Sequence, residues 1–142
     1  MPSGNKSKLI NDPLHGFVTL PSALVFDVVQ HPYFQRLRRI RQLGMSEWVY
    51  PGATHTRFHH ALGAMNLMVK ALETLRNKGV DITDEEREAA ILGILMHDIG
   101  HGPYSHTLEY TLAQGVNHED ISIMLMERMD VEFHGALRLA ID

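Results

Sequence analysis

Segment 83–100 is predicted to form a helix whose second half is apolar on nearly every side. Thr83 can cap its first turn, where three acidic residues follow at the positive end of the helix dipole. The apolar residues then run from Ala89 to Met96, with a single break at Gly93. A helix that is apolar all round is buried on most sides. The other elements of the chain are therefore expected to pack around this helix.

The rest of the sequence predicts further helices, so the expected fold class is all-α. Apolar residues recur at helical spacing in segments 22–30, 32–43, 57–78, 103–113, 118–129 and from about 132 onward. Gly44 and Gly79 are placed to end two of these helices. Strands are expected at most near the N-terminus, at 17–20, and around Trp48 and Tyr50. No alternation of strands and helices appears, which argues against an α/β fold.

Length and polarity are typical of a single soluble domain. The 142 residues match one domain of ordinary size, and the longest apolar stretch is much shorter than the ~20 residues that span a bilayer. The N-terminus is polar and contains no apolar signal core. We therefore expect one domain over 1–142, no membrane partner and a cytoplasmic location.

Positive charge is concentrated in one part of an acidic chain. The formal net charge is −4, which argues against nucleic acid or an anionic membrane as the main partner. Segment 36–57 has only one acid, Glu47, against five arginines: Arg36, Arg38, Arg39, Arg41 and Arg57. A phosphorylated partner would suit this segment, and so would a solvated helix face or an oligomer contact. Composition alone leaves these alternatives open.

Histidine and aspartate supply the candidate ligands for a metal. The chain has no cysteine and ten histidines, so a metal site must use nitrogen and oxygen ligands. His97 and Asp98 follow directly on the apolar run, where a carboxylate is costly unless a cation neutralises it. Gly100 and Gly102 would leave room for a ligand at the backbone. The competing interpretation is that Asp98 pairs with an arginine and His97 forms a hydrogen bond in the core.

A second group of histidines lies at the start of the predicted helix 57–78. His60 shares one helical face with Gly63 and Leu67, so it can point toward the junction that holds the His-Asp pair. Gly63 would let this helix pack closely on its neighbour. His59 points elsewhere and is expected at the surface.

Six short blocks of the sequence together resemble one protein family. They occur in order at residues 11–16, 34–38, 42–44, 50–55, 57–63 and 97–106. A histidine followed by a buried His-Asp pair is similar to the HD phosphohydrolase superfamily. The full series resembles the SAM-and-HD-domain dNTP triphosphohydrolases and their bacterial relatives. The resemblance covers nearly the whole chain and implies a helical HD domain with phosphohydrolase activity.

The same resemblance implies roles for ten residues, in three groups. The metal ligands would be His60, His97 and Asp98, holding one divalent Fe, Mn, Ni or Zn, and Mg²⁺ with the nucleotide is a further option. The catalytic cluster would be His106, Glu109 and His118, although the family usually has Asp where Glu109 stands. Arg57 would bind phosphate with His101 beside it, and Gln42 and Leu43 would contact the deoxyribose.

One expected ligand has no counterpart in the sequence. HD enzymes complete the protein ligands of the metal with a distal aspartate, and neither Asp130 nor Asp142 sits in a matching motif. The last segment, 133–142, is an apolar-periodic helix without a stop signal. We therefore expect the chain to be the N-terminal part of a truncated HD domain. A fourth position filled by water or by a neighbouring chain is the alternative.

The leading hypothesis is a metal-dependent phosphohydrolase that converts a dNTP into deoxynucleoside and triphosphate. Another phosphate ester, such as a nucleoside monophosphate or a cyclic nucleotide, would suit the same metal site. A module with an incomplete site that binds nucleotide or nucleic acid without turnover is the non-enzyme hypothesis. The expected partners are a small-molecule nucleotide and further copies of the chain, and nucleic acid is not indicated.

Overall fold

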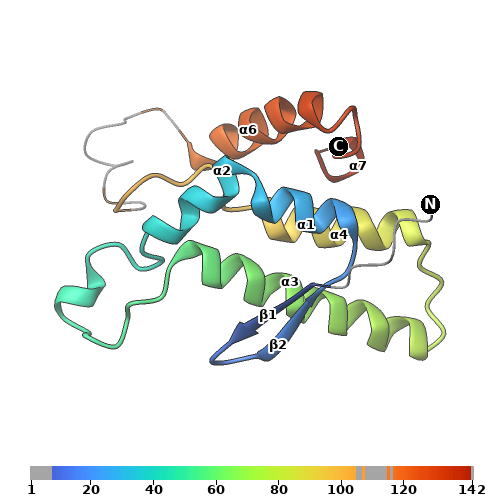
Figure 1. Ribbon diagram of the computed structural model, residues 1–142, viewed down its shortest axis with the longest axis horizontal. Helices are drawn as coiled ribbons and strands as arrows, with labels where there is room; N and C mark the ends of the chain where they lie inside the picture. Colours follow the sequence, from blue (N-terminus) through green and yellow to red (C-terminus); the bar gives the residue numbers. More distant parts are fainter. Residues whose placement is uncertain (1–7, 105–106, 108–114, 116, 142) are drawn as a thin grey trace.

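The computed structural model describes residues 8–104, 107, 115 and 117–141, and its fold is predominantly helical, as predicted. Two helices, α3 (Arg57–Asn77) and α4 (Asp84–Met96), run antiparallel and side by side through the centre (Figure 1). Figure 1 shows α6 (His118–Glu132) above α4, with the short α7 (Arg138–Ile141) packed against both. The described helices include none that is long and apolar enough to cross a membrane.

An antiparallel hairpin opens the described chain and lies below α3 in Figure 1. It pairs β1 (Lys8–Asp12) with β2 (Gly16–Leu20) in the register Lys8 opposite Leu20. The Oδ1 atom of Asp12 accepts hydrogen bonds from the N–H groups of Leu14 (2.9 Å) and His15 (2.8 Å), which forms the turn. These bonds, above all the one from His15, lower the pKa of Asp12. β1 has no counterpart among the predicted elements, because its residues carry no clear alternation of apolar and polar types.

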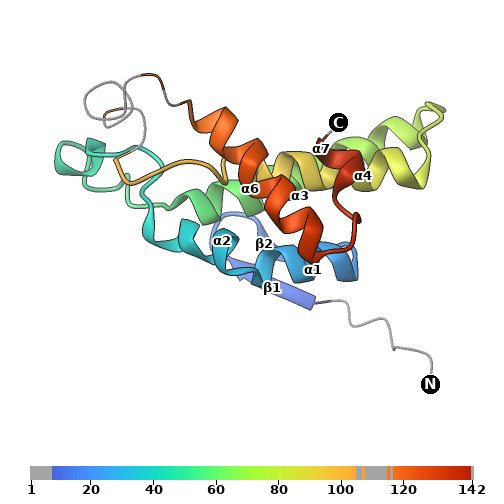
Figure 2. The ribbon, with the colours of Figure 1, turned by 90° about the horizontal axis from the view of Figure 1, so that it is seen from above.

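The first two helices are separated at His31 by the proline that follows it. α1 (Ala23–Gln30) begins at Ser22, whose hydroxyl accepts from the N–H of Val25 at 3.2 Å. Pro32 requires an extended residue before it, and His31 has φ −63° and ψ 139°. α2 (Pro32–Gln35) then starts in a new direction, as Figure 2 shows from above.

The predicted helix 32–43 is wrong beyond its first turn. α2 passes into a 3₁₀ turn, η1 (Arg36–Arg39), and Ile40 is extended, with φ −112° and ψ 116°. The Ile40 carbonyl accepts from the N–H of Arg57 at 2.9 Å, and the His55 carbonyl accepts from the N–H of Gln42 at 3.1 Å. These bonds close loop 40–56 onto the first turn of α3. The loop thereby carries Gln42 to the end of α3 that bears His60.

Loop 40–56 contains a second 3₁₀ turn in place of the strand considered around Trp48 and Tyr50. This turn, η2, spans Ser46–Trp48, and the described part of the loop pairs in strand fashion only where Arg41 bridges to Thr56. The Arg41 side chain fastens the loop, since its Nε lies 2.9 Å from a Glu47 carboxylate oxygen. Backbone hydrogen bonds along the loop and this ion pair together shape the segment.

The central position predicted for α4 is confirmed, but its end differs. Its N-terminal cap is as predicted: the Glu86 N–H donates to the Thr83 hydroxyl (3.1 Å) and the Thr83 N–H donates to the Glu86 carboxylate (2.8 Å). Four apolar side chains of its second half are buried: Ile91, Leu92, Leu95 and Met96. The helix ends at Met96, and residues 97–101 leave it as a turn, which we call the His-Asp turn.

Two glycines serve roles that differ from the predicted ones. A Cβ on Gly100 would collide with the His118 carbonyl and the Ser122 N–H, so this glycine allows α6 to sit directly on the His-Asp turn. A Cβ on Gly63 would lie 2.9 Å from the His15 Nε2 atom, so Gly63 makes room for the hairpin rather than for a neighbouring helix. Gly102 has nothing near its Cβ position and remains open, as expected.

Candidate metal centre and substrate pocket

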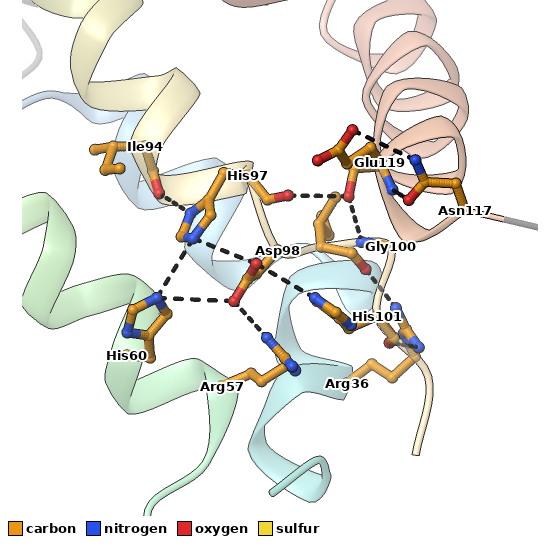
Figure 3. A network of polar contacts seen from close by, with 12 residues as sticks. Arg36, Arg57, His60, Ile94, His97, Asp98, Gly100, His101, Asn117 and Glu119 are labelled. Carbon is orange, nitrogen blue, oxygen red and sulfur yellow. Dashed lines mark hydrogen bonds and ion pairs between the residues drawn. The ribbon is translucent and has the colours of Figure 1, made fainter. Parts of the chain in front are cut away.

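The carboxylate of Asp98 is the centre of a polar cluster in the junction between α3 and the His-Asp turn. It is buried, yet four cationic or imidazole groups surround it (Figure 3). The Arg57 guanidinium lies 2.5 Å from Oδ2 and the His60 Nε2 lies 3.7 Å from the same oxygen. The Nε2 atoms of His97 and His101 lie 3.3 and 3.5 Å from Oδ1. The junction inferred from the sequence therefore exists.

Two of these histidines and the aspartate are arranged as metal ligands would be. The Nε2 atoms of His60 and His97 are 3.3 Å apart, and one ligand atom from each of the three residues lies within 4.8 Å of the others. His97 Nδ1 lies 2.7 Å from the Ile94 carbonyl, which fixes the proton on Nδ1 and leaves the Nε2 lone pair for an ion. Two imidazoles and a carboxylate suit a divalent transition metal.

The electrostatics keep His60 in the form that can bind a metal. Burial lowers the pKa of His60 most strongly, and the neighbouring His97 and Arg57 lower it further, while Asp98 acts in the opposite direction. The net shift is downward. His60 is therefore neutral at pH 7, and a neutral imidazole has one ring nitrogen with a lone pair for an ion.

The competing interpretation of Asp98 is also partly realised. Arg57 is buried at the first position of α3 and pairs with Asp98, as that interpretation required. His97, however, is held by a backbone carbonyl at one nitrogen and faces His60 and Asp98 with the other. The arginine therefore neutralises the Asp98 carboxylate, which is itself one of the three candidate ligands.

The cluster opens into a cavity of about 470 Å³. Every predicted site residue that the structure describes lines it: Gln42, Leu43, Arg57, His60, His97, Asp98, His101 and His118. The lining also includes three residues without a predicted role: Gly44, Tyr104 and Thr107. Gly44 and Tyr104 belong to blocks 42–44 and 97–106 of the family resemblance. A Cβ on Gly44 would lie 3.1 Å from the Tyr104 carbonyl oxygen. Only their membership of those blocks could have indicated them.

The predicted catalytic cluster is described in part. His118 is the first residue of α6, and its ring stacks on that of His101 with centroids 3.9 Å apart and planes at 17°. His106 and Glu109 lie outside the described residues. Asp130 accepts a hydrogen bond from the N–H of Leu137 at 2.8 Å, a local role in the turn after α6, and Asp142 lies outside the described residues.

The arginines of segment 36–57 do not form one phosphate-binding face. The Arg36 guanidinium turns inward and donates to the carbonyls of Ile99 and His101. Arg38 stacks on the Phe58 ring, 3.7 Å from its centroid. Of the five arginines, all of which are described, Arg57 alone lines the cavity.

His59 and His60 diverge as predicted. His59 Nδ1 lies 2.9 Å from the Thr56 hydroxyl, in the capping box that starts α3. His60 borders the cavity and His59 does not, while both border a second pocket of about 540 Å³ that lies against the hairpin turn and includes His15 and Leu67.

Comparison with known proteins identifies the family. The HD domain family model matches residues 57–135. The deoxynucleoside triphosphate triphosphohydrolase SAMHD1 homolog of Dictyostelium discoideum is 34% identical over 94% of this chain and 27% of its own length, and human SAMHD1 is 40% identical over 86% and 21%.

A crystal structure of a phosphohydrolase from Bacteroides thetaiotaomicron matches with a TM-score of 0.91 and 58% identity. The match covers 94% of this chain and 34% of that one. The chain thus spans about a third or less of the length of these relatives. The His-Asp pair after α4, the helical fold and these similarities agree, and the chain belongs to the HD-domain phosphohydrolase family.

Proposed function

We propose that the protein is a metal-dependent phosphohydrolase that cleaves a deoxynucleoside triphosphate into deoxynucleoside and triphosphate. The observation that carries this proposal is the shared cavity, on which the candidate ligands, Arg57 and Gln42 all open. A site for this reaction needs an electrophile beside the phosphate and a neutral contact for the sugar. The cavity of about 470 Å³ brings the candidates for both roles together, which supports the proposal.

The residues present fit a divalent metal. His60, His97 and Asp98 would hold it, since their ligand atoms already converge and His97 is oriented by the Ile94 carbonyl. When bound, such an ion polarises a phosphoryl oxygen and lowers the pKa of a nearby water. This chemistry applies to any phosphate ester, so substrate choice depends on the other residues of the cavity.

Arg57 is the candidate phosphate contact. It is the arginine of the cavity, and its NH1 already touches a carboxylate oxygen of Asp98. A guanidinium has five N–H donors in a fixed fork, so one edge can hold Asp98 while others face a phosphate. Arg57 would thereby tie the substrate phosphate to the candidate metal centre.

Gln42 is the candidate sugar contact. Its Oε1 atom is buried and has no hydrogen-bond partner among the described residues. A buried acceptor without a donor is costly, and a ligand hydroxyl would satisfy it. A deoxyribose hydroxyl is such a donor, and Leu43 beside it supplies apolar surface.

His101 and His118 are candidates for holding and moving a proton. Their stacked rings border the cavity, and His101 Nε2 lies 3.5 Å from Asp98 Oδ1. A histidine beside a carboxylate can donate to a leaving oxygen in its protonated form. His106 and Glu109 would complete this relay according to the family resemblance.

The names of the relatives support the dNTP as substrate. The human and Dictyostelium proteins are described as deoxynucleoside triphosphate triphosphohydrolases. This chain matches 21% of the length of the human protein and 27% of the length of the Dictyostelium protein. Product analysis tests the proposal: each of the four dNTPs is incubated with the full-length protein and Mn²⁺. Deoxynucleoside with inorganic triphosphate is the expected result. Release of orthophosphate or pyrophosphate alone would refute it and favour another phosphate ester.

The Arg57–Asp98 pair supports one alternative, a module that binds nucleotide without turnover. In that case the arginine, and no metal, would neutralise Asp98. Tight dNTP binding with no metal in the protein and no product would establish this alternative. Metal in the wild-type protein together with product release would exclude it.

A further inference from the structure

Two side chains outside the cavity hold the His-Asp turn from different elements. Ser122 belongs to α6 and Arg36 to η1, and neither lines the cavity nor was predicted as a site residue. Both bind the backbone of residues 97–101 rather than any of its side chains. Their effect is therefore on the position of His97, Asp98 and His101 together.

Ser122 bonds to the turn twice. Its buried hydroxyl accepts from the Gly100 N–H at 2.8 Å and donates to the His97 carbonyl at 3.1 Å. A helix end leaves such backbone groups without partners, and one hydroxyl satisfies two of them here. The approach is close because Gly100 has no side chain.

Arg36 bonds to the turn at two further points. Its NH1 donates to the His101 carbonyl at 2.9 Å and its NH2 donates to the Ile99 carbonyl. A guanidinium can hold two carbonyls at once because its donors have a fixed geometry. The backbone polar groups of four of the five turn residues are thus fixed by these two side chains.

Ser122 also relates the turn to His118. The two residues are four apart on α6, so they lie on the same helical face. That face carries the hydroxyl that binds the turn and the ring that stacks on His101. The bond between Ser122 and the turn therefore sets the distance between the candidate metal ligands and the candidate proton-transfer histidine.

We propose that Ser122 and Arg36 are positioning residues of the candidate metal centre. This inference rests on the proposed function, because it assumes that His60, His97 and Asp98 bind a metal. Outer groups that orient metal ligands affect metal affinity by roughly 10–100-fold. A group that only contributes to packing changes stability and leaves the affinity of the folded protein unchanged.

The test compares Ser122→Ala with Ser22→Ala in the full-length protein. Both changes remove a hydroxyl that accepts a backbone N–H bond, but Ser22 caps α1 and touches no residue of the turn. Mn²⁺ affinity is measured by competition with a metal chelator, and Tm is measured without metal. Arg36→Lys is the second variant, since an ammonium keeps the charge but lacks the fork that holds two carbonyls.

We expect Ser122→Ala and Arg36→Lys to weaken Mn²⁺ binding by about tenfold or more. Ser22→Ala should lower Tm and keep wild-type affinity. If Ser122→Ala fails to fold, Arg36→Lys decides alone. The proposal would be overturned if both variants had a lower Tm but bound Mn²⁺ with the same affinity as the Ser22→Ala control.

The outcome is separable from that of the proposed function, because affinity is measured without turnover. A wild-type protein that binds Mn²⁺ but releases no triphosphate would refute the dNTP activity while the affinity losses still support positioning. Unchanged affinities in a protein that does release triphosphate would refute positioning alone. A wild type that binds no divalent metal would refute both.

Discussion

The guanidinium of Arg57 lies 2.5 Å from the carboxylate of Asp98, and both residues are buried and line the cavity. Arg57 starts α3 and Asp98 follows α4, so the contact joins the two central helices at one end. This pair balances the negative charge of Asp98 when no metal does so. A metal held by His60, His97 and Asp98 would therefore share this carboxylate with Arg57.

Replacement of Arg57 should make stability depend on metal. Removing one partner of a buried pair leaves an uncompensated charge and costs roughly 3–5 kcal/mol. We expect Arg57→Met to lower the Tm of the metal-free protein strongly and Mn²⁺ to restore much of the loss. Thermal unfolding with and without Mn²⁺ measures this. An equal loss of Tm in both conditions would show that Arg57 does not share Asp98 with a metal.

Gly100→Ala should destabilise the fold, whereas Gly102→Ala should not. The new methyl at Gly100 would meet the backbone of His118 and Ser122, while the same methyl at Gly102 meets nothing within 4 Å. Overpacking of this kind costs typically 1–3 kcal/mol. Urea unfolding of both variants tests the difference. Two variants of equal stability would mean that α6 does not sit on the His-Asp turn as closely as described.

Gln42→Ala should impair catalysis and leave stability almost unchanged. The Oε1 atom accepts no hydrogen bond from the described residues, so its removal breaks none of their hydrogen bonds. If a substrate hydroxyl binds there, KM for the dNTP rises by about tenfold, which corresponds to ~1.4 kcal/mol. Steady-state kinetics and Tm are measured together. A wild-type KM would exclude Gln42 from the substrate site.

Asp12→Asn should reduce stability at neutral pH but not in acid. The pKa of Asp12 is lowered from its ordinary value of 3.8, chiefly by the bond from the His15 N–H. A carboxyl with a lowered pKa stabilises the fold above its unfolded pKa, and this contribution disappears as the pH falls through the lower, folded value. We therefore expect a difference of about 1 kcal/mol at pH 7 that shrinks below pH 4. Urea unfolding at several pH values measures it, and a constant difference would contradict the assignment.

Much of the site could be predicted because its residues are chemically unusual where they stand. Asp98 is notable directly after an apolar helix, and His60 is notable at the start of another helix on the face toward it. The structure brings these residues together with His97. The remaining pocket residues came from the family resemblance, since no local pattern distinguishes Gln42 or Leu43.

The incorrect predictions have a common physical cause, which is that tertiary contacts decided the outcome. Phe34, Leu37 and Ile40 are all buried, as a helix would require, but a 3₁₀ turn and an extended residue bury them equally well. Arg36 has the spacing of an outward residue, yet it turns inward because the His-Asp turn offers two carbonyls. Such partners are distant in sequence, and no local pattern indicates them.

The metal content of four purified full-length proteins tests the candidate metal centre most directly. Wild type, His60→Ala and His97→Ala are analysed for Fe, Mn, Ni and Zn, with Ser22→Ala as a folded control. We expect close to one equivalent of metal in wild type and control, and little in either histidine variant, each of which still unfolds cooperatively. Equal metal content in all four proteins, or none in the wild type, would contradict the metal centre.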